Sequence, residues 1–191
     1  MNIPLFPLNT VLFPGGPLPL RVFEPRYLDM VSQSMKTDSP IGVVLIKSGN
    51  EVGPTPDIYN IGTMAKISYW HERNDGLLGI TLTGIQRFKI IGSQENASKL
   101  LSADVEKIDN LAPYDIDDQN DHLISILEKI LDQLDPPFKT IARKLDDIEW
   151  VSARLLELLP TDLDDKQRLL ESNSVSDRLA KIESVLKTSN H

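Results

Sequence analysis

The segment from Pro4 to Tyr27 reads PLFPLNTVLFPGGPLPLRVFEPRY, and it decides the fold of the first half. Apolar residues alternate here with prolines, which cannot donate to a sheet ladder and therefore lie at strand starts, edges or bulges. The segment 14–17, Pro-Gly-Gly-Pro, is typical of a loop between two extended segments. Pro25 suits the first turn of a helix and Glu24 suits its entrance. We therefore predict two strands, a loop between them, and a helix that begins near Pro25.

The residues up to 110 continue in short strands around that helix. Leu28, Val31 and Met35 recur at helical spacing and predict its inward face. A β-branched run at 41–46 indicates a buried strand, and 47–60 reads as a loop. Gly84 predicts a tight turn or a bulge, and the segment 74–76, Asn-Asp-Gly, predicts a hairpin turn. Further strands are expected at Ile61–Trp70, Leu77–Thr83, Ile85–Ile91 and Leu101–Ile108.

Beyond Leu111–Asp115 the pattern becomes helical. Apolar residues from Leu123 to Leu134 form one stripe, and prolines 136 and 137 end that helix. Further helices are expected from Phe138, over 148–158, over 163–171 and over 175–187, with Thr161 and Ser174 spaced as N-caps. Strands followed by helices indicate an α+β protein with a boundary near residue 112.

Composition narrows the classes of function. The 191 residues include no cysteine, which excludes disulfides, thiolate metal sites and thiol catalysis. No apolar run is long enough for a membrane helix, and the N-terminus lacks the pattern of a signal peptide. We therefore expect an unprocessed cytoplasmic protein with no membrane partner.

The net charge of −8 is unevenly distributed. Residues 1–110 carry ten basic and eleven acidic side chains, whereas residues 111–191 carry ten and seventeen. An acidic chain without a basic patch is a poor candidate for nucleic acid, because neutralised phosphates supply most of that affinity.

Several strings in this order resemble the Lon-protease N-terminal (substrate-recognition) domain family. They are PLFPLNTVLFPG, FEPRY, GVVLI at 42–46, IGT at 61–63 and TGIQRF at 83–88, with looser matches over 150–159 and 165–171. The resemblance implies a PUA-like β pseudobarrel over 1–112 and a helical bundle over 113–191. In full-length Lon proteases this unit precedes an ATPase and a protease domain and helps to recognise unfolded or tagged substrates.

The chain departs from the full enzyme in its motifs. It has no G-x-x-x-x-G-K-[ST] phosphate loop, and the domain with the family's Ser–Lys dyad is missing. We therefore expect a stand-alone, non-enzymatic module without a cofactor, as a monomer or a weak homodimer. It would bind unfolded or exposed polypeptide, or a protease partner. The alternative is an RNA-binding module, as PUA-like barrels often are. A hydrolase is a third hypothesis, but the sequence contains no G-x-S-x-G nucleophile elbow and no convincing general base.

The polar residues of the FEPRY string have two interpretations. Glu24, Arg26 and Tyr27, beside Pro25, could contact a peptide terminus. The favoured interpretation is structural: Glu24 pairs with Arg26 or Arg87, because a buried carboxylate needs a partner. We expect Glu24 and Arg87 to be buried together.

Other candidate sites are weaker. Tyr69 and Trp70, with the loop 47–60, are the predicted peptide-contact surface, because binding concentrates at aromatics and loops. No two of the three histidines have metal-ligand spacing. The acidic run at Asp115, Asp117, Asp118 and Asp121 lacks the glycine and glutamate of a calcium loop, so no metal is expected.

Overall fold

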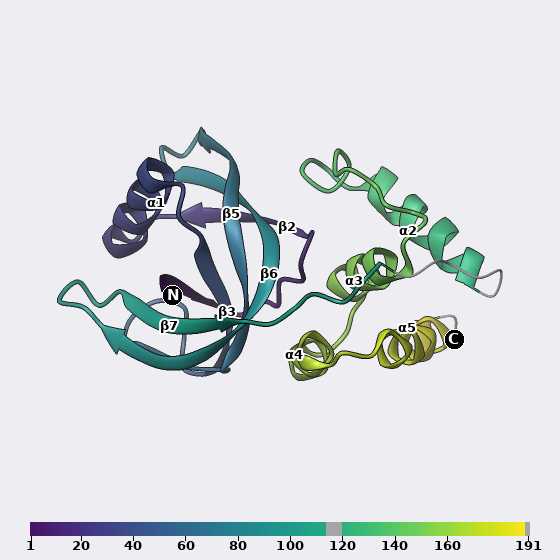
Figure 1. The fold of residues 1–191 in the computed structure, drawn as a ribbon. Coiled ribbons are helices and arrows are strands. Elements are labelled where there is room, and N and C mark those ends of the chain that lie inside the picture. Colours follow the sequence, from purple (N-terminus) through teal and green to yellow (C-terminus); the bar gives the residue numbers. More distant parts are fainter. Residues whose placement is uncertain (114–119, 190–191) are drawn as a thin grey trace. The chain divides into compact units, whose positions relative to one another are not determined.

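The protein is described by a computed structural model that covers residues 1–113 and 120–189. Figure 1 shows its elements, which fall into two compact units, Met1–Asn110 and Leu111–His191. The boundary predicted near residue 112 lies beside this division. Within the described ranges, no helix is long and apolar enough to cross a membrane.

The first unit is a mixed sheet that closes on itself. It contains seven strands and one helix. In chain order they are β1 (Asn2–Leu8), β2 (Pro17–Val22), α1 (Pro25–Thr37), β3 (Ile41–Ser48), β4 (Asp57–Ile58), β5 (Ile61–Glu72), β6 (Leu78–Glu95) and β7 (Leu101–Lys107). The strand order is β1-β7-β6-β5-β3-β4, and β2 pairs with β6 outside this path. Because β1 also pairs in parallel with β3, the path from β1 through β3 forms a barrel. The predicted pseudobarrel is confirmed.

Two apolar clusters fill this unit. One lies under α1, where Tyr27, Met30 and Val31 pack on strand residues; the other centres on Phe88. The predicted inward face of α1 was therefore partly wrong. Val31 is buried, but the side chains of Leu28 and Met35 are 37% and 45% exposed. The helix turns Tyr27 inward instead, because its ring stacks on Phe6 of β1 with centroids 4.3 Å apart.

The two strands predicted on either side of Gly84 are one strand. β6 runs unbroken from Leu78 to Glu95, and Gly84 lies beside a bulge, where the pairing passes from Met64–Gln86 to Ala65–Gly84. The bulge interpretation is therefore confirmed and the tight turn is wrong. The backbone of Gly84 exchanges hydrogen bonds of 2.8 and 2.9 Å with Gly15 and Gly16. The predicted 74–76 hairpin turn is also confirmed, with Gly76 at φ 75°.

The second unit contains four described helices: α2 (Asp121–Gln133), α3 (Ile148–Leu158), α4 (Leu163–Glu171) and α5 (Val175–Ser189). The helix predicted from Phe138 does not form. Residues 135–141 make successive turns with bonds of 3.2–3.4 Å, and Phe138 is only half-buried. A short segment without a deeply packed face cannot offset the cost of helix nucleation.

Of the two predicted N-caps in the second unit, one is confirmed and one is wrong. Ser174 caps α5 as predicted, since its Oγ accepts a bond of 3.1 Å from the Asp177 N–H. At α4 the N-cap is Asp162, one residue after the predicted Thr161.

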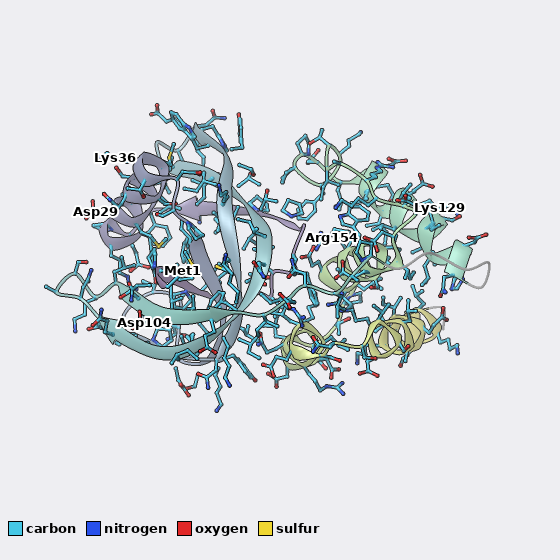
Figure 2. All side chains as sticks on the ribbon, in the orientation of Figure 1. Met1, Asp29, Lys36, Asp104, Lys129 and Arg154 are labelled. Carbon is cyan, nitrogen blue, oxygen red and sulfur yellow. The ribbon has the colours of Figure 1, made fainter. Side chains whose placement is uncertain are left out.

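Two arginines of the second unit are buried, one on α3 and one on α5. Arg154 lies 2.8 Å from Glu157 and stacks over Trp150, and Arg178 of α5 lies 2.8 Å from Glu149. Each arginine side chain is 1% exposed. Figure 2 labels Arg154 within its helix. Such charges remain buried because a partner offsets much of their desolvation cost.

We predict that Gly84→Ala lowers the free energy of unfolding by about 1–3 kcal/mol. A Cβ at this position would come 2.4 Å from the Phe13 carbonyl oxygen, which is backbone and cannot move aside cheaply. Gly92→Ala is the matched control on the same strand, because a Cβ there meets nothing within 4 Å. Urea unfolding of the two variants measures the difference, and equal stabilities would contradict the close approach at Gly84.

Candidate functional site

The helix α1 begins at the FEPRY string. Glu24 is its N-cap, with extended backbone angles of φ −76° and ψ 132°, and Pro25 occupies the first turn. The Glu24 carbonyl accepts the N–H bonds of Tyr27 and Leu28, both at 3.0 Å. Its carboxylate lies 3.0 Å from Nη2 of Arg26. The string therefore supplies both the start of the helix and an ion pair.

The Arg26 side chain connects α1 to the turn before β7. It is 7% exposed, and its Nη1 donates a bond of 2.9 Å to the Lys99 carbonyl, in the turn before β7. The guanidinium carbon lies 4.7 Å from the centroid of the Tyr27 ring. These contacts hold the helix in place, which favours the structural interpretation of Glu24, Pro25, Arg26 and Tyr27.

Arg87 lies in a different place. Its side chain is 1% exposed, and its Nη2 donates to the Asp109 carbonyl after β7. Glu24 comes two residues after Val22, and Val22 pairs with Leu78 of β6. Arg87 lies nine residues further along the same strand, so it is far from Glu24. The Glu24 side chain is also 20% exposed. The expected joint burial of Glu24 and Arg87 is therefore wrong; Arg26 is the partner of Glu24.

The predicted contact residues Tyr69 and Trp70 line a hollow between α1 and β5. Its volume is about 330 Å³, and it is lined by Ser34, Met35, Asp38, Ser39, Lys66, Ile67, Ser68, Tyr69 and Trp70. Three apolar side chains are open to solvent there: Met35 is 45% exposed, Tyr69 60% and Trp70 57%. The charged lining groups, Lys66 and Asp38, form an ion pair of 2.9 Å, so the hollow has no net charge. We call this the α1–β5 hollow.

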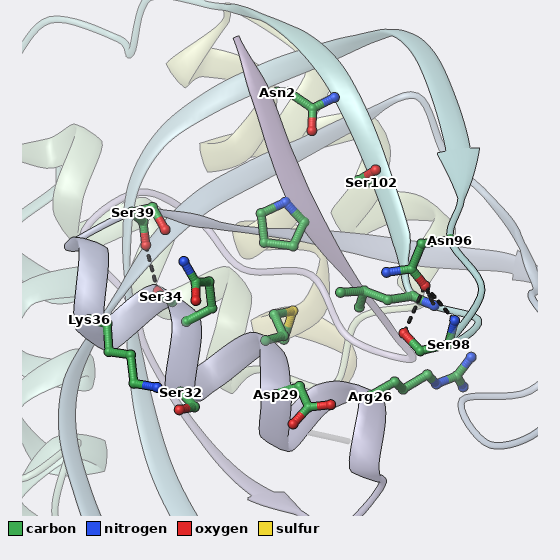
Figure 3. A pocket seen from close by; sticks show the side chains of 14 residues that line it. Asn2, Arg26, Asp29, Ser32, Ser34, Lys36, Ser39, Asn96, Ser98 and Ser102 are labelled. Atoms are coloured by element: carbon green, nitrogen blue, oxygen red, sulfur yellow. Dashed lines mark hydrogen bonds between the residues drawn. The ribbon is translucent and has the colours of Figure 1, made fainter.

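A larger hollow of about 570 Å³ lies on the other side of α1 (Figure 3). Its lining is rich in hydroxyl and amide side chains: Asn2, Ser32, Gln33, Ser34, Ser39, Asn96, Ser98 and Ser102. Several bond one another, since Ser34 Oγ donates to the Ser39 carbonyl and Ser98 Oγ donates to Asn96 Oδ1. Asp29 and Lys36 belong to the same lining, and Figure 2 shows both on α1. This polar hollow offers hydrogen bonds but no aromatic surface.

The loop at 47–60 contributes to a third hollow rather than to the first. Glu51 and Val52 line it together with Phe23 and Tyr27, and its volume is about 240 Å³. The Glu51 carboxylate accepts a bond of 2.6 Å from the Asn9 N–H, which ties the loop to the end of β1. The predicted surface of Tyr69, Trp70 and this loop is thus two surfaces.

Metal ligands do not gather in the described part of the chain. Residues 1–113 and 120–189 contain no group of three histidine or carboxylate side chains that could hold an ion. The His122 ring nitrogen Nε2 lies 2.6 Å from the Glu183 carboxylate. Asp115, Asp117 and Asp118 of the acidic run lie outside the described residues, and Asp121 begins α2.

The fold and these hollows define an α+β protein with a closed β pseudobarrel and a separate helical unit. The model of the ATP-dependent protease La (LON) substrate-binding domain matches residues 2–188. The chain belongs to this family.

Known relatives agree with that assignment. The crystal structure of a Lon N-terminal domain protein from Xanthomonas campestris is 32% identical, with a TM-score of 0.76, and the match covers 96% of this chain and 98% of that one. The N-terminal domain of a Mycobacterium avium complex Lon protease shares the fold at 18% identity, with a TM-score of 0.63 over both whole chains. Lon protease 1 of Hydrogenovibrio crunogenus is 28% identical over 94% of this chain, which spans only 22% of that protein.

Sequence reasoning missed the position of Met35 and both hollows beside α1. The spacing of Met35 from Leu28 and Val31 predicts an inward side chain, but Met35 is 45% exposed. The adjacent aromatic residues Tyr69 and Trp70 near the end of β5 gave a signal, since exposed aromatic side chains in a row are unusual on a barrel strand. Nothing local indicated the polar hollow, because its lining comes from segments far apart in the chain.

The contacts of Tyr27 predict a loss of stability in alkali. Burial raises the pKa of its phenol, although the Arg26 guanidinium lowers it. The unfolded phenol has a pKa of about 10, and the folded pKa lies above it. The phenol therefore contributes its full share to the free energy of unfolding below about pH 10, and this share is lost as the pH rises through the folded pKa. The free energy of unfolding of the wild type should fall more between pH 9 and pH 11 than that of Tyr27→Phe. Equal losses would show that Tyr27 is not a buried phenol.

Proposed function

We propose that this chain is a non-enzymatic polypeptide-binding module that takes exposed apolar segments of unfolded proteins or of a protein partner. The observation that carries the proposal is the α1–β5 hollow. Met35, Tyr69 and Trp70 are exposed there, and the charged groups of its lining compensate each other. Exposed apolar clusters beside a pocket mark interaction sites, and aromatics contribute most to such contacts.

The chemistry of the hollow matches polypeptide. An apolar side chain that enters it meets Met35 and the two aromatic rings, while Ser34, Ser39 and Ser68 in its wall can bond to a peptide. The Lys66–Asp38 pair is already internally compensated, so a neutral segment meets no unpaired charge there. Membership of a substrate-binding domain family supports the same interpretation.

RNA is the competing ligand, because Tyr69 and Trp70 could also stack on bases. The charges oppose it. The first unit has ten basic against eleven acidic side chains, and Lys66 at the hollow is paired. Without a cationic surface, the phosphates of a nucleic acid would gain little from binding.

The proposal is tested by titration of the purified protein with unfolded casein and, separately, with single-stranded RNA at two salt concentrations. Casein should bind with an affinity that added salt barely changes, since apolar contacts are weakly screened. Trp70→Ala should weaken this binding by about tenfold, as expected for the loss of one aromatic anchor. Ile91→Ala is the matched control, because Ile91 is also 57% exposed but does not line the hollow.

Other outcomes decide against the proposal. Binding of RNA alone, with a steep dependence on salt, would favour the nucleic-acid interpretation. Binding of neither ligand would contradict recognition of unfolded segments. Equal losses in the two variants would move the site away from the hollow.

A further inference from the structure

We infer that the bound segment is recognised as an extended strand that adds to the free edge of β5, residues 66–72. The partner class is therefore a polypeptide segment in β conformation, apolar and low in charge, rather than a preformed helix. This inference rests on the proposed function and specifies how the hollow is used.

The edge is free because β3 covers only the first part of β5. The pairs between β3 and β5 end at Ile41–Ala65, whereas β5 continues along β6 as far as Glu72–Leu78. Among the described residues, none pairs with the β3 side of β5 beyond Ala65. α1 lies beside this stretch (Figure 1). Residues of both elements line the α1–β5 hollow.

The hydrogen bonds of the hairpin show which groups point outward. The Arg73 N–H donates 2.9 Å to the Leu77 carbonyl, so Arg73 faces β6. Because backbone groups alternate along a strand, the N–H and C=O of Glu72 and Trp70 point away from β6. A bulge at Ser68 shifts this alternation, as the pairing passes from Tyr69–Thr81 to Ile67–Leu82.

The opposite side of β6 gives the same result independently. The Gly84 N–H donates to the Gly16 carbonyl, so Gly84, and by alternation Leu82 and Ile80, face β2. The partner of Ile80 on β5 is Trp70, whose backbone therefore cannot bond to Ile80 and points outward. Ile67 points outward by the same argument from Leu82.

The other edge of this three-stranded stretch is closed by its sequence. Gly16 bonds to β6, so alternation turns Pro17 and Pro19 of β2 outward. Neither has an N–H, and prolines at an edge prevent strand addition. The stretch 66–72 of β5 contains no proline, so a strand can add only on the side of the α1–β5 hollow.

An added strand would bring alternate side chains into contact with the hollow. Strand addition takes its affinity from main-chain bonds and its specificity from pockets for alternate side chains. The lining residue Met35 and the exposed rings of Tyr69 and Trp70 favour apolar side chains at those positions. The Lys66–Asp38 pair leaves no net charge to recruit a charged segment.

The first test uses the tightest-binding peptide from a set of overlapping casein peptides, with two N-methylated forms. One form is methylated at odd positions and the other at even positions, so each loses the donors of one strand edge. Strand addition predicts that one form loses about tenfold or more in affinity, the loss of one or two hydrogen bonds, while the other stays within about twofold. Equal effects would overturn strand addition even though casein binds, whereas failure of casein itself to bind would overturn the proposed function.

The second test changes the protein edge. Glu72→Pro removes an outward donor and should weaken the unmethylated peptide about fivefold, while Glu72→Ala keeps the backbone N–H and should bind like the wild type. Circular dichroism checks that both variants fold, and if Glu72→Pro does not, the methylated peptides decide alone. A concentration-dependent dimer that Glu72→Pro abolishes, seen by sedimentation, would identify a second copy as the occupant and overturn the inference.

Discussion

The first unit depends on the way β1 divides its pairing between two strands. Residues 2–4 pair with β7, and residues 5–8 pair in parallel with β3, which closes the barrel. Closure removes most edges, and edges are where strands would otherwise associate. β3, however, reaches β5 only up to Ala65, because the chain before Ile41 belongs to α1 and its left-handed C-cap at Asp38. The open edge of β5 is thus a direct consequence of where the helix ends.

In the proposed function, α1 forms the second wall of the hollow beside that edge. Arg26, Tyr27 and Met30 fix α1 against the barrel, and the buried guanidinium bonds to Glu24 and to the turn before β7. The ion pair of Glu24 with Arg26 is part of this support. The exposed apolar side chains of the hollow come from both walls, Met35 from α1 and Tyr69 and Trp70 from β5.

The sequence predicted what local chemistry determines. The prolines and glycines of 4–27 fixed the strands and the loop, and Gly76 fixed the hairpin. The sequence could not determine which face of α1 becomes buried. The spacing of Met35 fits a buried face, but Tyr27 is buried instead because its ring stacks on Phe6. Gly84 looked like a strand end, whereas its lack of a side chain serves the approach of Phe13 from another segment. The apolar spacing after Phe138 predicts a helix, but the segment forms turns. Apolar spacing alone does not indicate whether the rest of the protein offers a surface for the helix to pack on. Tyr69 and Trp70 could be named as a pair, but the free edge beside them depends on register, which a single sequence does not reveal.

Amide hydrogen exchange along β5, followed by NMR in the free protein, tests the central claim most directly. An open edge predicts alternation: the outward amides of Trp70 and Glu72 exchange fast, while the amides of Tyr69 and His71, which face β6, are protected. Ile67 should exchange fast as well. Uniform protection from Lys66 to Glu72 would mean that another segment already covers this edge, and the account of an available strand-addition site would be contradicted.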